Sequence, residues 1–180
     1  MKVHRIYEKY GICLKLVDIL VDIQDAEFIL ELRTNEQRAR YLSPTEKDVE
    51  KQREWIQEYK KRESLGTDFY FIAFDDKGNS YGTVRIYNID AYEFTFGSWI
   101  FKNSSPASLI INSWFIVAEI GFLELKMRKC KFDIKKANKR VLKFQRRFKS
   151  SLIGENDDTY FFELDFERFV VERDRILNIF

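Results

Sequence analysis

The chain has 180 residues, 45% of them apolar and 33% charged, which predicts one globular domain over residues 1–180. Its net charge of +2 is too small to favour nucleic acid as a partner. The N-terminal residues lack the apolar run of a signal peptide, and polar residues interrupt the apolar stretch at 109–125, which favours a buried helix. We therefore expect a cytoplasmic protein without a membrane anchor. The two cysteines lack the spacing of a metal site, so no metal is expected.

The first part of the chain predicts one strand followed by two helices. Residues 12–19 read as a strand, and Asp22 is a candidate cap for a helix with apolar residues at helical spacing. The run 43–46, Ser-Pro-Thr-Glu, matches a capping box with proline at the first helical position. It predicts a second helix, which places Ile56 and Tyr59 together on its apolar side.

The middle of the chain predicts an antiparallel meander of three strands, at 68–74, 81–89 and 92–101. Between the first two, residues 75–80 carry the turn chemistry of a hairpin. A Ser-Ser-Pro turn follows the third strand and leads into an apolar helix at 108–126. The turn therefore separates the two most hydrophobic segments of the chain.

The last part predicts a strand at 129–134, a helix at 138–149, a loop at 154–158 and a strand at 159–166. The order β-α-α-β-β-β-α-β-α-β is typical of an α+β fold. We expect a mixed, mostly antiparallel central sheet of six to seven strands flanked by about four helices. The helix at 108–126 should cross over between two parallel neighbouring strands.

This order of elements, with a turn before the buried helix, resembles the GCN5-related N-acetyltransferases (GNAT superfamily) over roughly residues 12–168. GSWIF at 97–101 resembles the strand that pairs with the pantetheine arm of acetyl-CoA, and the next turn holds the place of the pyrophosphate loop. The run 132–148 resembles the family's later strand, its asparagine and the helix beside the thioester. The run 29–43 resembles the first helix and substrate loop of the ribosomal-protein acetyltransferase-like branch.

The resemblance implies an acetyl-CoA-dependent N-acetyltransferase with a small-molecule substrate. The whole chain is most similar to members that acetylate amino groups of nucleotide-linked sugars for surface polysaccharides. The alternatives are the same chemistry on a protein N-terminus or a polyamine, and a non-catalytic GNAT-like binding domain. A polyamine pocket should be rich in carboxylates, whereas a nucleotide-sugar pocket should be basic and aromatic. Homo-oligomerisation stays open, because the sequence has no specific interface signal.

The Ser-Ser-Pro turn departs from the family's phosphate loop. The basic or amide residue and the two small residues of that loop fall here on Ser105, Ser108 and Ile110. Unpaired N–H groups at the helix start still favour an anion, although a plain Ser-Pro helix cap is the alternative. Lys143 and Arg146 on the next basic helix are candidates for the 3′-phosphate. The implied cofactor site comprises Trp99, Ile100, Phe101, Ser104, Ser105, Ala107, Ser108, Leu109, Asn138, Lys143 and Phe144.

Acetyl transfer needs a base that takes a proton from the amine. The candidates are Glu93, in the strand before GSWIF, and Asp133, which lies among apolar residues where burial would raise its pKa. Ser98 is a candidate donor to the thiolate or the substrate. The family's tyrosine acid, seven residues after Asn138, is replaced by Gln145. For both carboxylates an ordinary structural role is the alternative.

The resemblance also implies an acceptor site that includes Arg33, Asn35, Tyr41 and Tyr81. An arginine there would pair with a sugar-nucleotide diphosphate through two parallel hydrogen bonds. A surface helix end is the alternative for this region. Asn138 either caps the helix that it begins, contacts the cofactor, or does both.

Overall fold

The computed structural model describes residues 3–20 and 22–177, and within them eight strands form one sheet in the order β1-β2-β3-β4-β5-β6-β8-β7. The strands are β1 (Ile6–Lys9), β2 (Ile12–Leu16), β3 (Asp68–Phe74), β4 (Ser80–Tyr87), β5 (Glu93–Phe101), β6 (Lys129–Lys135), β7 (Ser151–Glu155) and β8 (Thr159–Asp165). The α-helices are α1 (Gln24–Thr34), α2 (Glu36–Ala39), α3 (Val49–Ser64), α4 (Ala107–Glu119), α5 (Lys139–Gln145) and α6 (Phe166–Leu177). A π-helical turn (Ile120–Glu124) continues α4, and a 3-10 turn (Arg146–Phe148) continues α5. The predicted α+β class is confirmed, with more strands and helices than expected.

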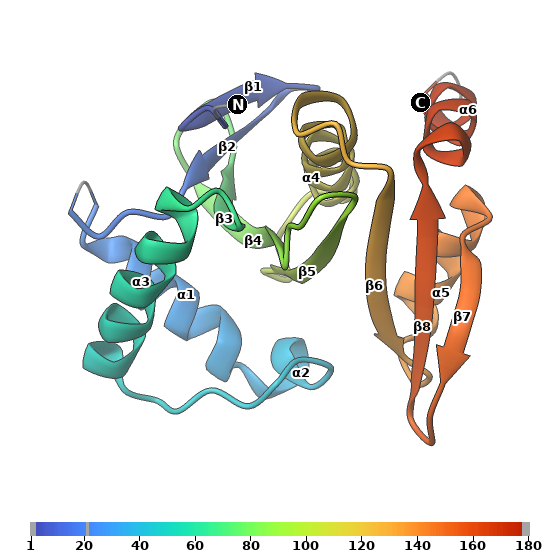
Figure 1. Ribbon diagram of the computed structural model, residues 1–180. Helices are drawn as coiled ribbons and strands as arrows, with labels where there is room; N and C mark the ends of the chain where they lie inside the picture. Colours follow the sequence, from blue (N-terminus) through green and yellow to red (C-terminus); the bar gives the residue numbers. More distant parts are fainter. Residues whose placement is uncertain (1–2, 21, 178–180) are drawn as a thin grey trace.

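Helices cover both faces of the sheet, which explains why β3 is apolar at each position after Asp68. Phe69, Phe71 and Ala73 belong to the core that β3 shares with α4. Tyr70 and Ile72 point to the other face and belong to a second core with α1 and α3. Figure 1 shows α1 and α3 together on one side of the strands and α4 on the other. A strand that is buried on both faces reads as a continuous apolar run, because neither face can be polar.

The apolar stretch after the Ser-Ser-Pro turn is a core helix, as predicted. Among the described residues, Ala107–Glu124 is the one helix long and apolar enough to cross a membrane, and 61% of that window is buried inside the protein. The π-helical turn contains Gly121, where an added Cβ atom would lie 2.3 Å from Cζ of Phe94. Glycine therefore allows the Phe94 ring to pack directly against the helix backbone.

The sheet divides between β5 and β6, which are parallel neighbours as the sequence predicted. They pair through three residue pairs, from Glu93↔Lys129 to Thr95↔Lys131. Beyond them, β5 continues along β4, whereas β6 continues along β8. The two strands therefore diverge, and Figure 1 shows β6, β8 and β7 turned away from the first five strands.

The predicted start of the second helix is wrong. Residues 43–46 form a loop, and α3 begins at Val49 with Asp48 as its N-cap. The Asp48 carboxylate accepts hydrogen bonds from the backbone N–H groups of Glu50 (2.9 Å) and Lys51 (3.2 Å). An aspartate that binds the first N–H groups of a helix is a strong cap, so the helix starts after Asp48 rather than after Ser43, five residues earlier.

Four elements lie outside the predicted set, namely β1, α2, β7 and α6. The strands β1 and β7 are the two edges of the sheet, and most of their side chains are exposed. Edge strands with exposed side chains show no clear alternation of apolar and polar residues, so the sequence does not predict them. The predicted strand at 12–19 ends at Leu16, and the predicted helix at 138–149 is α5 followed by its 3-10 turn.

Candidate active site

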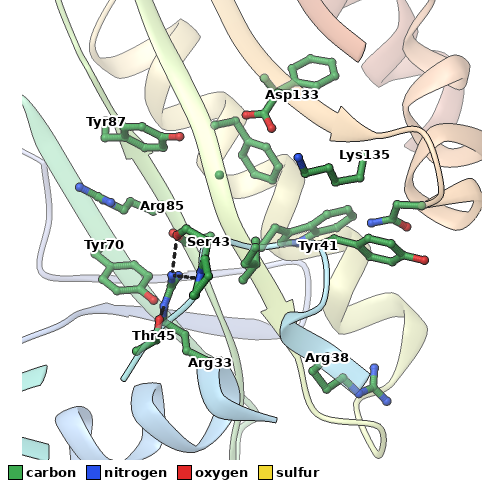
Figure 2. Close-up of a pocket in the computed structure, with 18 of the residues that line it drawn as sticks. Arg33, Arg38, Tyr41, Ser43, Thr45, Tyr70, Arg85, Tyr87, Asp133 and Lys135 are labelled. Carbon is green, nitrogen blue, oxygen red and sulfur yellow. Dashed lines mark hydrogen bonds between the residues drawn. The ribbon is translucent and has the colours of Figure 1, made fainter. Parts of the chain in front are cut away.

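A cavity of about 670 Å³, called here the large cavity, opens where β5 and β6 diverge. Its walls come from the end of α1, the loop after α2, the start of α3, strands β3 to β6 and α5 (Figure 2). Elements from both parts of the divided sheet thus meet around one space. A cavity of this size accommodates a small-molecule ligand.

A β-bulge shapes the β5 wall of the large cavity. Thr83 pairs with Ile100, whereas Arg85 pairs with Gly97, so β5 holds one residue more than β4 in this interval. Within the bulge, Ser98 has a φ of 48°, and its carbonyl accepts a hydrogen bond from the Thr83 hydroxyl (2.9 Å). Bulges of this kind bend a strand and free backbone groups from the ladder. The bulge therefore changes the direction of β5 beside the opening.

An ion pair anchors the floor of the large cavity. The Asp68 carboxylate is buried and accepts two hydrogen bonds from the Arg85 guanidinium, one of them 2.7 Å long, and one from Arg62 Nε (2.9 Å). The Arg85 guanidinium lies 5.0 Å from the ring centre of Trp55 and 4.6 Å from that of Tyr87. One cation thus holds two aromatic rings that line the cavity.

Tyr87 and Asp133 face one another across the large cavity, from β4 and β6 (Figure 2). Burial raises the pKa of Tyr87, and the negative charge of Asp133 raises it further. Asp133 itself is exposed to solvent, so its predicted burial among apolar residues is wrong. The reason is strand alternation: Phe132 and Ile134 point into the core, which turns Asp133 to the opposite face.

The side chain of Arg33 holds the loop that forms one rim of the large cavity. Its Nε donates to the Thr45 hydroxyl (2.7 Å), and its Nη2 donates to the Ser43 carbonyl (3.1 Å) and hydroxyl (3.0 Å), as Figure 2 shows. Tyr41 connects this loop to the other part of the sheet, because its hydroxyl donates to the Ala137 carbonyl (3.2 Å). Both residues line the cavity, as their predicted role in the acceptor site requires.

A second cavity of about 390 Å³, called here the small cavity, lies between the end of β5, the start of α4 and α5. Four basic side chains line it, and no acidic side chain lies among the described residues around it. They are Arg38, Arg140, Lys143 and Arg147. The first hydrogen bond into α4 runs from Ile110 N–H to the Pro106 carbonyl, which leaves the preceding N–H groups of the first turn available to an anion.

Six of the predicted cofactor residues line the small cavity: Trp99, Ile100, Phe101, Ala107, Lys143 and Phe144. Trp99 lines the large cavity as well, so the two cavities adjoin at its ring. Asn138 lines the large cavity and also caps α5, because its Oδ1 accepts from Val141 N–H (3.3 Å). The position of Asn138 therefore fits both of its predicted roles, as the cap of α5 and as a contact of a bound cofactor.

The remaining predicted cofactor residues lie outside both cavities. The side chains of Ser104 and Ser108 are exposed at the turn, and Leu109 is a buried core residue. The Ser105 hydroxyl donates to the Tyr81 carbonyl (3.2 Å), so it fixes the turn to β4. Of the two candidates for the 3′-phosphate, Lys143 lines the small cavity and Arg146 does not.

Three further predicted residues are away from the cavities. Glu93 forms an ion pair with Lys131 (2.6 Å) at the end of β5 that remains paired with β6. The Tyr81 hydroxyl donates to Asp75 (3.1 Å) within the β3–β4 hairpin, and Asn35 caps α2. Ser98, in contrast, lines the large cavity from the bulge. Of the catalytic candidates, the structure thus brings together Ser98 and Asp133 but not Glu93.

Sequence reasoning missed several residues that line the cavities, among them Trp55, Arg85, Tyr87, Arg38 and Arg140. A signal for two of them was present, because Arg85 and Tyr87 alternate along a predicted strand and so share one face. No comparable signal exists for Arg38 and Arg140, which come from different helices and meet only in the folded chain.

A sheet that opens between two parallel strands, beside a basic cavity at the start of a buried helix, offers a binding site for a phosphate-bearing ligand. The chain belongs to the GNAT family of acetyltransferases, because the family model described as acetyltransferase (GNAT) domain matches residues 18–149. The protein is an acetyltransferase of the GNAT type, and acetyl-CoA is its donor.

Solved structures agree with this assignment. The apo structure of FdhC, described as a nucleotide-linked sugar GNAT, is 30% identical with a TM-score of 0.85, over 97% of this chain and 98% of that one. Spermidine N-acetyltransferase from Vibrio cholerae, solved with CoA and spermine, is 16% identical with a TM-score of 0.72, over 89% and 98% of the two chains. The ribosomal-protein-S5-alanine acetyltransferase from Vibrio fischeri is 13% identical with a TM-score of 0.74, over 89% and 96%. A comparison with curated proteins gave no significant match.

Proposed function

We propose that this enzyme, in the cytoplasm, transfers the acetyl group of acetyl-CoA to the amino group of a nucleotide-linked amino sugar used for surface polysaccharides. The observation that carries the proposal is the character of the large cavity, which is basic and aromatic. Five basic side chains and three carboxylates line it among the described residues: Arg33, Arg38, Lys51, Arg85 and Lys135 against Glu46, Asp48 and Asp133. The likeness to the nucleotide-linked sugar GNAT, at 30% identity, supports the same class of substrate.

The rim of the large cavity suits the nucleotide part of such a substrate. The Trp55 side chain lines the cavity and is 37% exposed, so the part of its ring that Tyr59 and Arg85 leave uncovered can contact a base. The partners of Arg33 at the rim are hydroxyl and carbonyl oxygens rather than carboxylates, so they leave its positive charge unneutralised. That charge and Arg38, which also lines the cavity, would attract a diphosphate.

The small cavity suits the phosphate groups of acetyl-CoA. Its four basic residues and the free N–H groups of α4 surround a space that adjoins the large cavity at Trp99. A diphosphate bound at the start of α4 would allow an extended pantetheine arm to run along β5 toward the bulge at Ser98. The diverging half of β5 has no β6 partner, so its backbone groups on that edge are available to the amides of the arm.

Residues that line the large cavity would carry out the transfer. Asp133 takes a proton from the incoming ammonium, directly or through a water molecule, and so exposes the nitrogen lone pair. Tyr87 remains protonated because of its raised pKa, and it donates a hydrogen bond that orients the acceptor. The nitrogen would then attack the thioester carbonyl carbon and lose its second proton to solvent. The C–S bond would break, and the thiolate would leave with the bonding electron pair and take a proton from solvent. Backbone N–H groups near the β5 bulge would stabilise the oxyanion that forms in between.

An acceptor panel tests the proposal. The purified enzyme is incubated with acetyl-CoA and, separately, with UDP- and dTDP-linked amino sugars, spermidine, and a peptide with a free N-terminus. Thiol release and product mass are recorded. We expect acetylation of at least one nucleotide-linked amino sugar, with a kcat/KM at least a hundredfold above that for spermidine or peptide. A preference for spermidine or peptide would refute the proposed substrate class, although the enzyme would remain an acetyltransferase.

Two variants separate the acceptor site from the cofactor site. Trp55→Ala removes the proposed stacking surface, so the KM for the nucleotide sugar should rise about tenfold, given about 1–3 kcal/mol per stacked base. The KM for acetyl-CoA should stay within twofold of the wild-type value. Gln57→Leu, an exposed position on the same helix, is the control and should change neither constant. An unchanged sugar KM in Trp55→Ala would exclude Trp55 as the base-stacking residue.

A further inference from the structure

The Thr83 hydroxyl on β4 holds the bulge in β5 from within the protein. Thr83 alternates along β4 with Arg85 and Tyr87, so all three side chains point to the face of the sheet that carries the large cavity. Arg85 and Tyr87 line the cavity, whereas Thr83 is fully buried and donates its hydrogen bond to the Ser98 carbonyl (2.9 Å). A buried side chain thus contacts the wall of the large cavity from behind.

The segment that Thr83 holds is the irregular part of β5. The register places Ser98 and Trp99 together opposite Val84, so the regular ladder does not fix this segment. Ser98 has a φ of 48°, in the left-handed region that a serine adopts only where the surrounding structure favours it. Valine would fill the same buried space as Thr83, but it could not bind the carbonyl. The hydroxyl at position 83 therefore serves the bulge rather than the packing of the core.

Tyr70 on β3 fixes the direction of the Thr83 hydroxyl. Tyr70 is buried as well, and its hydroxyl donates to Thr83 Oγ1 (3.4 Å). A threonine hydroxyl has a single hydrogen, so a hydroxyl that accepts from Tyr70 keeps its own hydrogen for the Ser98 carbonyl. Burial raises the pKa of Tyr70, so the phenol retains the proton that it donates. The two hydroxyls therefore form a directed pair that ends at the bulge.

The peptide unit between Ser98 and Trp99 carries this restraint into the cavity. Because a trans peptide bond is planar, the Ser98 carbonyl and the Trp99 N–H group point in opposite directions. A carbonyl that is held toward Thr83 and β4 turns the Trp99 N–H group away from β4, to the edge of β5 that β6 leaves open. Both residues line the large cavity, and Trp99 lines the small cavity as well. The N–H group therefore lies on the proposed path of the pantetheine arm.

We propose that Thr83 is a positioning residue, which holds the peptide unit between Ser98 and Trp99 so that the Trp99 N–H group faces the thioester oxygen of acetyl-CoA. This inference rests on the proposed path of acetyl-CoA along β5. As the acceptor nitrogen bonds to the carbonyl carbon, one electron pair of the C=O bond moves onto the oxygen, and it returns when the C–S bond breaks. An N–H group that is fixed before the reaction stabilises the negative oxygen without reorganisation. Thr83 itself transfers no proton.

Steady-state kinetics with the acceptor that the panel identifies test this role. Thr83→Val keeps the shape of the side chain and should lower kcat by about tenfold to a hundredfold. The acceptor KM and the dissociation constant of CoA should stay within about threefold, because the contact strengthens only in the transition state. Thr83→Ser keeps the hydroxyl and should retain at least about half of the wild-type kcat. The matched control, Thr159→Val, removes a buried hydroxyl that binds Asp158 (2.6 Å) on β8, and its kcat should stay within about twofold of wild type.

An infrared measurement gives a readout that needs no acceptor. The C=O stretch of acetyl-CoA labelled with carbon-13 at the thioester carbon is recorded by isotope-edited difference spectroscopy on the bound ligand. A hydrogen bond to the oxygen weakens the C=O bond and lowers the frequency of its stretch. We therefore expect a lower frequency in wild type and Thr83→Ser than in Thr83→Val. Equal frequencies in wild type and Thr83→Val would show that the hydroxyl does not position the N–H group, which overturns the proposal.

The outcomes distinguish this inference from the proposed function. If the wild type does not bind acetyl-CoA, the cofactor site is misassigned and both proposals fail. If a nucleotide-linked sugar is acetylated while Thr83→Val keeps the wild-type kcat, this inference alone fails. Equal losses of kcat in Thr83→Val and Thr159→Val would trace the effect to stability and would also overturn it. If Thr83→Val does not fold, the measurements are made on Tyr70→Phe, which frees the Thr83 hydroxyl to rotate; a kcat and a C=O frequency equal to those of wild type would then refute the proposal.

Discussion

The ion pair beneath the large cavity gives a prediction whose magnitude follows from burial. The Asp68 side chain is 2% exposed and the Arg85 side chain 16% exposed, whereas Arg62, the third member, is 40% exposed. Asp68→Asn keeps the shape of the side chain but leaves the Arg85 guanidinium without its counter-charge. The removal of one partner from a buried pair costs about 3–5 kcal/mol, and the low end applies because asparagine still accepts a hydrogen bond and Arg62 is partly solvated.

Thermal unfolding measures this loss. For a chain of 180 residues, each kcal/mol shifts the melting temperature by about 2–4 °C, so Asp68→Asn should lower it by about 6–12 °C. Glu58→Gln is the matched control: it breaks the pair with Lys61, whose partners are 61% and 70% exposed, on the same helix as Arg62. This surface pair should shift the melting temperature by less than about 2 °C, since exposed pairs three or four residues apart on a helix contribute about 0.2–0.5 kcal/mol. Equal shifts for the two variants would refute the argument from burial.

Three further predictions follow from the site and the core. Ser108→Asp adds a negative charge at the exposed start of α4, so the affinity for CoA should fall about tenfold. The melting temperature should stay the same or rise slightly, because a negative charge at a helix N-terminus interacts favourably with the helix dipole. An unchanged CoA affinity would place the diphosphate elsewhere. Tyr87→Phe should lower kcat but leave the alkaline limb of the pH–rate profile in place. The pKa of Tyr87 is raised above the ordinary tyrosine value of about 10, so its hydroxyl stays protonated at every pH below that value. A shift of that limb would show that Tyr87 titrates during catalysis. Gly121→Ala places a methyl group against the buried Phe94 ring and should cost about 1–3 kcal/mol in urea unfolding, and a neutral result would show that the ring can move aside.

The central strands and the buried helix were predictable because burial leaves a pattern in the sequence. The run at 69–74 is apolar on both strand faces, and the predicted bounds of this strand, 68–74, agree with β3. The edges of the sheet were not predictable in this way, because Leu152 and Ile153 are exposed on β7 and follow no alternation. The Ser-Pro-Thr-Glu run misled for a different reason. Its hydroxyl groups bond to Arg33, a partner ten or more residues away that a local pattern cannot reveal.

The site was predictable only where one segment supplies neighbouring residues. The stretch from Trp99 to Phe101 and Ala107, at the start of α4, line one cavity, as residues close together in the chain can. Glu93 was a poor candidate because strand alternation alone could not say which end of β5 borders the opening. The opposition of Tyr87 and Asp133 depends on the divergence of two strands, which is a property of the whole sheet rather than of either sequence.

The three residue pairs between β5 and β6 have a consequence for the motions of the molecule. Through these pairs, β5 and the strands on its β1 side are joined to β6 and the strands on its β7 side. Beyond them β5 lacks a β6 partner, so a pantetheine arm bound there would act as a short additional strand beside β5. Amide hydrogens between Gly97 and Phe101 should then exchange with deuterated solvent more slowly in the CoA complex than in the free protein. Residues on β6 should show the same protection to a smaller extent. The donor would thus become a structural part of the sheet for the length of each catalytic cycle.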